Sequence, residues 1–183
     1  MSARPAFEAG WIQTFSGRTF YPCDPRPADL DIADIAGALA RQCRFAGHCL
    51  RFYSVAEHCC HVCDQAALDH KLSALMHDAS EAYLVDIPRP IKPQLANYHA
   101  LEDRLMNVIA ARYGFAWPMP AEVEKLDRAM LTDERAQNMA RTEHSDEMWG
   151  SIFAPLGVRL QFWTPEVAQF EFVARFYRYG RAL

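Results

Sequence analysis

The sequence contains no apolar run that approaches the roughly 18 residues needed to cross a bilayer. Its first residues, MSARPAFEAGWIQ, also lack the apolar stretch of a secretory signal. Both absences favour a cytoplasmic location, where cysteine thiols are kept reduced. We therefore expect free thiols at all six cysteines, which are Cys23, Cys43, Cys49, Cys59, Cys60 and Cys63.

An excess of positive charge is lacking as well. The formal net charge is −4, and broad binding of polymeric nucleic acid needs a dense basic patch. A small phosphorylated ligand remains compatible, because two or three local cations can hold one. The sequence has no glycine-rich loop that could act as a P-loop and no strand–helix alternation that would support a Rossmann fold.

What is present fits one soluble domain over residues 1–183, since 51% of the chain is hydrophobic and 23% is charged. We predict an all-α bundle of about six helices with a possible short hairpin at 11–22, around Ser16-Gly17. Residues 144–163 look irregular and are a possible flap. The expected helices are 30–43, one that begins at Ser54, 71–84, 95–113, 121–142 and one from Thr164 to the residue before Gly180.

Several helix ends carry clear signals. Ser54 and Glu57 have the spacing of a capping box, and Gly114 suits the end of the fourth helix. Thr164, followed by Pro165, is a strong start for the last helix. That helix carries an apolar stripe of Val167, Phe170, Val173, Ala174 and Tyr177.

The residues that indicate chemistry begin with His77-Asp78, which lie with Glu81 in an otherwise apolar helix. At spacings of three and four, these side chains should point to roughly one side. An isolated His-Asp pair is most often a surface patch or a buried pair. Polar groups inside a core are costly unless they are paired or bind an ion, so neighbouring ligands decide between these readings.

Two further residues supply such neighbours. His58 lies near an apolar stripe of its own helix, and Asp127 lies beside a hydrophobic face, whereas Asp133 has a poorer claim. His58, His77, Asp78 and Asp127 together form a mixed nitrogen and oxygen set. That set suits one divalent transition metal, Mn²⁺, Fe²⁺, Co²⁺ or Zn²⁺, with positions open for water and phosphate.

The order His…His-Asp…Asp resembles the HD superfamily of metal-dependent phosphohydrolases. SVAEH followed by HDASEAYLVDIPRPIK is similar to small bacterial 5′-deoxynucleotidases. GRTFYP, CRFAGH and FYSVAEH are similar to small HD hydrolases that include phage dATP triphosphohydrolases. The resemblance covers residues 14–135. One departure is that only the eighteen residues 59–76 separate the two histidines, fewer than in the deoxynucleotidases, which could reshape the pocket or a subunit interface.

The resemblance implies roles for particular residues. His58, His77, Asp78 and Asp127 match the metal ligands. Glu81 matches the acid near the attacking water, Arg44 and Lys92 match basic residues at the substrate phosphate, and Asp86 matches a residue near the sugar. Two residues outside these matches are further candidates: His48, which could line the pocket although loop histidines are as often idle, and Arg18, which could reach a base or phosphate.

The resemblance thus implies hydrolysis of a small nucleotide by a homodimer or higher homo-oligomer that associates with neither membranes nor polymeric nucleic acid. The substrate stays open between deoxynucleoside monophosphates and triphosphates. Two other classes compete. The cysteine-rich run 57–63 could form a structural zinc site or a Cys60–Cys63 redox pair, but a second ligand pair and a βαβ setting are missing. A nucleotide-sensing module without activity would be expected to lack a ligand, and all four are present.

Overall fold

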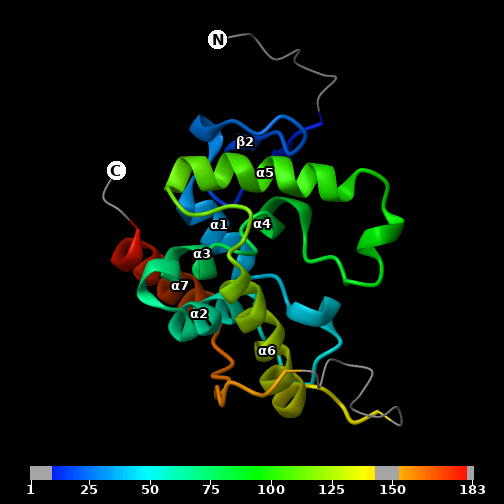
Figure 1. Cartoon of the computed structure of the whole chain (residues 1–183). Helices are drawn as coiled ribbons and strands as arrows, with labels where there is room; N and C mark the ends of the chain where they lie inside the picture. Colours follow the sequence, from blue (N-terminus) through cyan, green and yellow to red (C-terminus); the bar gives the residue numbers. More distant parts are fainter. Residues whose placement is uncertain (1–9, 143–152, 181–183) are drawn as a thin grey trace.

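Helices dominate the computed structural model, which describes residues 10–142 and 153–180 (Figure 1). Seven α-helices, four short 3₁₀ turns and one two-stranded sheet occur in these residues, so the predicted helical class is confirmed. The α-helices are α1 (Ile32–Leu39), α2 (Val55–Gln65), α3 (Lys71–Leu75), α4 (Glu81–Leu84), α5 (Tyr98–Tyr113), α6 (Ala121–Asn138) and α7 (Pro165–Tyr179). The 3₁₀ turns are η1 (Pro27–Asp29), η2 (Arg44–Gly47), η3 (Leu68–His70) and η4 (Lys92–Gln94).

The predicted N-terminal hairpin is present. Strand β1 (Ile12–Gln13) pairs antiparallel with β2 (Thr19–Phe20), and the turn between them uses Gly17 at φ 84°. The hairpin is attached to α1 through a buried carboxylate. Asp34 accepts hydrogen bonds from the backbone N–H of Ser16 at 2.6 Å and from its hydroxyl at 3.0 Å.

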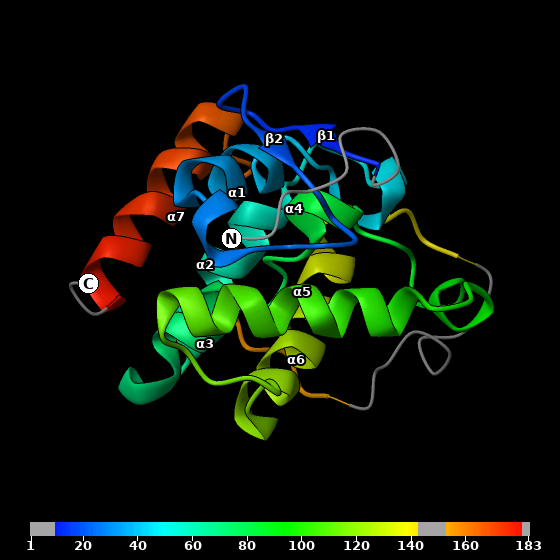
Figure 2. The same ribbon diagram turned by 90° about the horizontal axis from the view of Figure 1, so that it is seen from above.

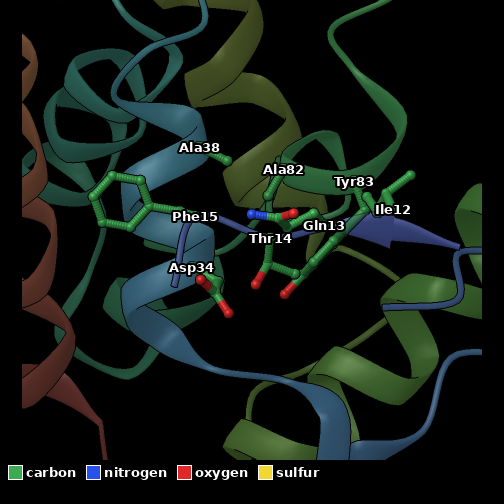
Figure 3. Close-up of a pocket in the computed structure, with 8 residues that line it drawn as sticks. All are labelled: Ile12, Gln13, Thr14, Phe15, Asp34, Ala38, Ala82 and Tyr83. Atoms are coloured by element: carbon green, nitrogen blue, oxygen red, sulfur yellow. The ribbon is translucent and has the colours of Figure 1, made fainter. Parts of the chain in front are cut away.

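A small cavity of about 70 Å³ lies between this hairpin, α1 and α4 (Figure 3). Pockets for drug-sized ligands usually measure roughly 300–1,000 Å³, so this one is too small for a nucleotide. Its wall is made by Ile12, Gln13, Thr14, Phe15, Asp34, Ala38, Ala82 and Tyr83.

The predicted caps at Ser54, Thr164 and Gly114 are present, but the capping box is half formed, because the carboxylate of Glu57 accepts from residues 161–163 instead of from Ser54. Ser54 accepts from the backbone N–H of Glu57 at the start of α2, and Thr164 accepts from the N–H of Val167 at the start of α7. Gly114 ends α5 at φ 75°, a conformation that costs glycine little. Local side-chain chemistry therefore fixed where three of the helices begin or end.

The prediction of one helix over 71–84 is wrong. Helix α3 ends at Leu75, Met76 has a ψ of 6°, and residues 76–80 form a turn before α4 begins at Glu81. In an unbroken helix the carbonyl of Ala74 would accept from the amide of Asp78. Here that carbonyl accepts from Nδ1 of His77 at 2.7 Å instead. The His77-Asp78 pair thus lies in the turn between α3 and α4, not in the middle of a helix.

Three other helices are shorter than the sequence predicts. Helix α1 covers 32–39 rather than 30–43, because Cys43 leaves the helix to form an isolated β-bridge with Ser54. Helix α5 begins at Tyr98 rather than 95, after Asn97 in the left-handed conformation. Helix α6 ends at Asn138 rather than 142.

Helix α7 packs along α1, α2 and α3 at one side of the bundle, as the views from the front and from above both show (Figures 1 and 2). The face it buries is Ala168, Phe172 and Phe176. In the predicted stripe, Phe170 and Tyr177 are instead 68% and 71% exposed. Of that stripe, Val173 packs against the core, whereas Phe170 and Tyr177 do not, since α7 is apolar on more than one side.

The predicted flap at 144–163 lies partly outside the described residues, in 143–152. The described remainder has no helix or strand, but it is attached to the bundle. Asp133 of α6 accepts from the N–H groups of Leu156 at 2.7 Å and Gly157 at 3.2 Å. Glu57 of α2 accepts from the N–H groups of residues 161, 162 and 163 at 2.7–2.8 Å. Residues 156–163 are therefore a fixed strap and not a free flap.

One hydrophobic core runs through the described helices, with Tyr53, Phe20, Phe172 and Ile35 among its largest fully buried side chains. Among these helices, none combines the length and the apolar character that a bilayer span requires.

Candidate metal centre

Three parts of the fold bring the predicted ligand residues together. His58 comes from α2, Asp127 from α6, and His77 with Asp78 from the turn between α3 and α4. The two Nε2 atoms of the histidines are 3.2 Å apart. Oδ1 of Asp127 lies 3.2 Å from Nε2 of His58 and 3.8 Å from Nε2 of His77. Oδ2 of Asp78 lies 3.2 Å from Nε2 of His77 and 3.8 Å from that of His58.

The hydrogen bonds on the other ring nitrogens decide which way the imidazoles face. Nδ1 of His77 meets the carbonyl of Ala74, which can only accept, so Nδ1 carries the proton. Nδ1 of His58 lies 2.6 Å from a carboxylate oxygen of Glu134 and donates in the same way. In neutral imidazoles, both Nε2 atoms then present lone pairs to each other and to two carboxylates.

Such a group of acceptors needs positive charge between its members. Burial opposes a charged imidazole, yet the neighbouring carboxylate of Asp78 raises the pKa of His77 well above its ordinary value. Burial likewise favours a neutral acid, but the imidazoles hold the pKa of Asp78 well below its usual range. Ligands about 2.0–2.2 Å from one ion are typically about 3–3.5 Å from each other, close to the spacings found here. His58, His77 and Asp127 therefore lie close enough together to hold a divalent transition metal, whereas Asp78 forms a second, overlapping group with His77 and Cys59.

Glu134 is a site residue that the sequence reasoning missed. It is fully buried on α6, and it bonds to Nδ1 of His58 and to Nη2 of Arg44 at 3.1 Å. A carboxylate behind a ligand histidine fixes its tautomer and orientation. Glu134 follows Asp127 by seven residues, two turns along the same helix face, and that spacing was the signal that could have identified it.

Arg44 lies against this cluster. Its side chain is buried, with Nη1 3.7 Å from Oδ2 of Asp78 and Nη2 bonded to Glu134, while its Nε has no hydrogen-bond partner among the described residues. One guanidinium thus balances two carboxylates of the site and keeps one buried donor unused.

Glu81 begins α4, just after the turn that holds His77 and Asp78. Its side chain is buried, and Oε2 has no hydrogen-bond partner in the described part of the chain. Burial, followed by the carboxylates of Asp78 and Asp86, raises the pKa of Glu81 well above its ordinary value. A buried acid with an unused oxygen beside a metal-type cluster is equipped to handle a proton.

Asp86 lies beyond α4, half-buried, and Gln42 holds it in position. The side-chain oxygen of Gln42 accepts from the backbone N–H of Asp86 at 3.2 Å, and its amide donates to the carbonyl of Glu81 at 2.9 Å. Burial raises the pKa of Asp86, and Arg44 lowers it in part. The structure thus places Asp86 near the cluster.

The remaining candidates lie in different surroundings. Lys92 donates to Glu102 of α5 at 2.9 Å and lies 3.7 Å from Oε1 of Glu81. His48 is exposed after η2. Arg18 forms an ion pair with Asp31 at 3.0 Å, at the base of the hairpin.

The cysteines divide between the site and the core. Cys59 lies close enough to His77 and Asp78 to form a second three-ligand group that shares His77. Burial raises the pKa of Cys59 to about 11, so its sulfur is a thiol in this setting. Cys60 and Cys63 are buried in the core, and burial raises the pKa of Cys63 to about 12. Neither belongs to a metal-type group among the described residues, which weakens the zinc-or-redox alternative.

The fold and the site together define a mainly helical protein with a His/Asp cluster that could hold a metal. No protein-family model matches the chain. The chain is 42% identical over 125 residues to Uncharacterized protein YfdR of Escherichia coli K12, a match that covers 68% of this chain and 70% of that protein. It is 35% identical over 132 residues to Uncharacterized protein RCAP_rcc00048 of Rhodobacter capsulatus, covering 67% of each. The chain belongs to the family of these two proteins.

Proposed function

We propose that the protein is an HD-type metal-dependent phosphohydrolase that removes the 5′-phosphate of 2′-deoxynucleoside monophosphates. The observation that carries the proposal is the convergence of His58, His77 and Asp127 on one point, with Oδ2 of Asp78 3.2 Å from Nε2 of His77. The residues that would hold the metal are His58, His77, Asp78 and Asp127. A divalent transition ion bound there would lower the pKa of a water and neutralise a phosphate oxygen.

The chain's own groups would perform the rest of the reaction. Glu81 would accept the proton of the attacking water through its unused oxygen. The water oxygen would bond to phosphorus, the bond from phosphorus to the 5′ oxygen would break, and that oxygen would leave as the nucleoside hydroxyl by taking up the proton that Glu81 received from the water. Arg44 would offset negative charge that accumulates beside Asp78.

The sugar contact is assigned to Asp86. Its carboxylate lies after α4, near the cluster and outside its centre, where a hydroxyl of the sugar could donate to it. Crowding there would disfavour a 2′-hydroxyl, which accounts for the proposed preference for deoxynucleotides. Equal turnover of ribo- and deoxynucleotides would contradict this part.

The test is a substrate panel. Ribo- and deoxynucleoside mono-, di- and triphosphates are incubated with the protein and Mn²⁺, Co²⁺ or Zn²⁺, and the assay resolves phosphate from tripolyphosphate. We expect phosphate from deoxynucleoside monophosphates, and loss of activity on chelation. Tripolyphosphate release would support the triphosphohydrolase alternative. Nucleotide binding without any release would indicate a sensing module and overturn the proposal.

A further inference from the structure

The segment between α4 and α5 leaves the bundle on the side away from α7, and it carries two cations, Arg89 and Lys92 (Figures 1 and 2). From the sequence alone, either residue could contact a phosphate bound at the metal-type cluster. The structure separates them by what each side chain already contacts.

Lys92 is committed to the protein. Its ammonium group donates to Glu102 at 2.9 Å, lies 3.7 Å from Glu81 and sits 5.5 Å from the ring centre of Tyr98. Only 20% of its side chain is exposed. An ammonium held between two carboxylates and an aromatic ring would have to break these contacts to reach a substrate.

Arg89 is in the opposite situation. Its side chain is 69% exposed, and its guanidinium lies 3.9 Å from Oδ2 of Asp127, beyond hydrogen-bond distance. The other oxygen of Asp127 faces the imidazole of His58. Arg89 therefore stands on the solvent side of the cluster, close to the carboxylate of Asp127.

The local backbone favours keeping Arg89 there. Prolines on both sides restrict it: Pro88 and Pro90 fix their own φ near roughly −65°, and a residue before proline is confined to extended conformations. The carbonyl of Pro88 accepts from the N–H of Ile91 at 2.8 Å and closes the turn. The guanidinium can thus stay near the cluster without strong bonds of its own.

We propose that Arg89 binds the phosphate of the substrate on the open side of the metal centre, and that Lys92 instead positions Glu81 and Glu102. A guanidinium offers paired N–H donors that match two phosphate oxygens, which suits an exposed residue that must capture a ligand. Arg44 is less available, because its side chain is buried and its Nη2 already donates to Glu134. This inference rests on the proposed function.

The experiment measures binding of inorganic phosphate by calorimetry to protein loaded with Co²⁺, beside turnover of a deoxynucleoside monophosphate. We expect Arg89→Ala to weaken phosphate binding roughly 10-fold or more, as for loss of a hydrogen bond to a charged group, and Arg89→Lys to recover part of it. Lys92→Ala should change the dissociation constant by less than about 3-fold. Arg178→Ala, which removes an exposed arginine of α7, is the matched control and should have no effect.

The outcomes separate the two claims. Phosphate binding that Arg89→Ala leaves unchanged, or that Lys92→Ala weakens more, overturns the assignment even if the enzyme turns over nucleotides. Absence of phosphate binding by the unmodified protein also overturns it. If binding depends on Arg89 while no nucleotide is hydrolysed, the assignment stands and the proposed function fails. Because Arg89 is exposed, its variants should keep the unmodified melting temperature, which is recorded for each.

Discussion

Glu57 and His58 are consecutive, fully buried residues of α2, yet their side chains have quite different partners. Glu57 receives three backbone N–H groups from the strap at 156–163. His58 turns its Nε2 toward another imidazole and two carboxylates. The same contrast recurs on α6, where Asp133 receives N–H groups from the strap and Asp127 faces the histidines.

The difference lies in what satisfies a buried acid. Around Glu57 and Asp133, donors come from the chain itself, so the carboxylates are stable as they stand. Around Asp127, acceptors face one another, and only a cation or protons can lower their free energy. Burial alone therefore does not distinguish a structural acid from a functional one, but its partners do.

The largest effect should follow from removing a residue of the cluster. His77→Ala or Asp78→Ala should lose the bound metal and with it all measurable turnover, because each deletes one ligand. Metal content by elemental analysis and phosphate release test this. His70→Ala, a substitution at the partly exposed histidine of η3, is the control and should retain both. Full activity in His77→Ala would contradict the functional role assigned to the cluster, and with it the contrast between the cluster and the strap.

Glu81→Gln should give the next largest effect. The amide keeps the shape of the side chain but cannot take a proton, so turnover should fall by roughly 10²–10⁴. Metal content and substrate binding should stay near those of the unmodified protein. If the metal is lost instead, Glu81 belongs among the ligands and the cluster is larger than the four residues named.

A third prediction concerns the support behind the ligands. Glu134→Gln replaces the carboxylate that receives Nδ1–H of His58 by an amide, and should weaken metal binding by roughly 10–100-fold. Competition with a chelator measures the affinity. Asp133→Asn, one position earlier on α6, is the matched control and should leave metal affinity unchanged. Equal losses of metal affinity in both variants would mean that any substitution in this part of α6 disturbs the site, and would contradict a specific role for Glu134.

The smallest expected effect comes from Glu57, the carboxylate that holds the strap. Glu57→Gln should lower the free energy of unfolding by about 1–3 kcal/mol, because one amide oxygen cannot replace two carboxylate oxygens for three donors. Denaturant unfolding measures this. Metal stoichiometry should stay the same although the neighbouring residue is His58. Loss of metal without loss of stability would show that the strap and the centre are not separate.

Much of this was predictable from the sequence where the signal is local. Ser54, Thr164 and Gly114 identify helix ends because their own side chain or backbone forms the cap. The proximity of His58, His77 and Asp127 could be predicted because each lies beside an apolar face of the chain. The break at Met76 could not, since it depends on the bond from His77 to the carbonyl of Ala74.

Long-range contacts explain most of the other differences. No sequence signal near Glu57 predicts that the N–H groups of residues 161–163 donate to its carboxylate. Helix α7 has Phe172 and Phe176 on one face and Phe170 and Tyr177 on another, so its periodicity does not say which face is buried. Glu134 was overlooked because its partner His58 lies 76 residues away.

The hydrogen bonds between Glu57 and residues 161–163 have a consequence for folding of the chain during synthesis. All four residues of the metal-type cluster are synthesised before the strap, so for that interval Glu57 has a helix around it but none of its three donors. Burying it early would leave the carboxylate with His61 of the same helix as its one contact among these bonds, which opposes closure of the core around α2. A chain cut before residue 161 would stay in that condition. Residues 161–163 are therefore needed to satisfy a carboxylate that is synthesised more than a hundred residues earlier.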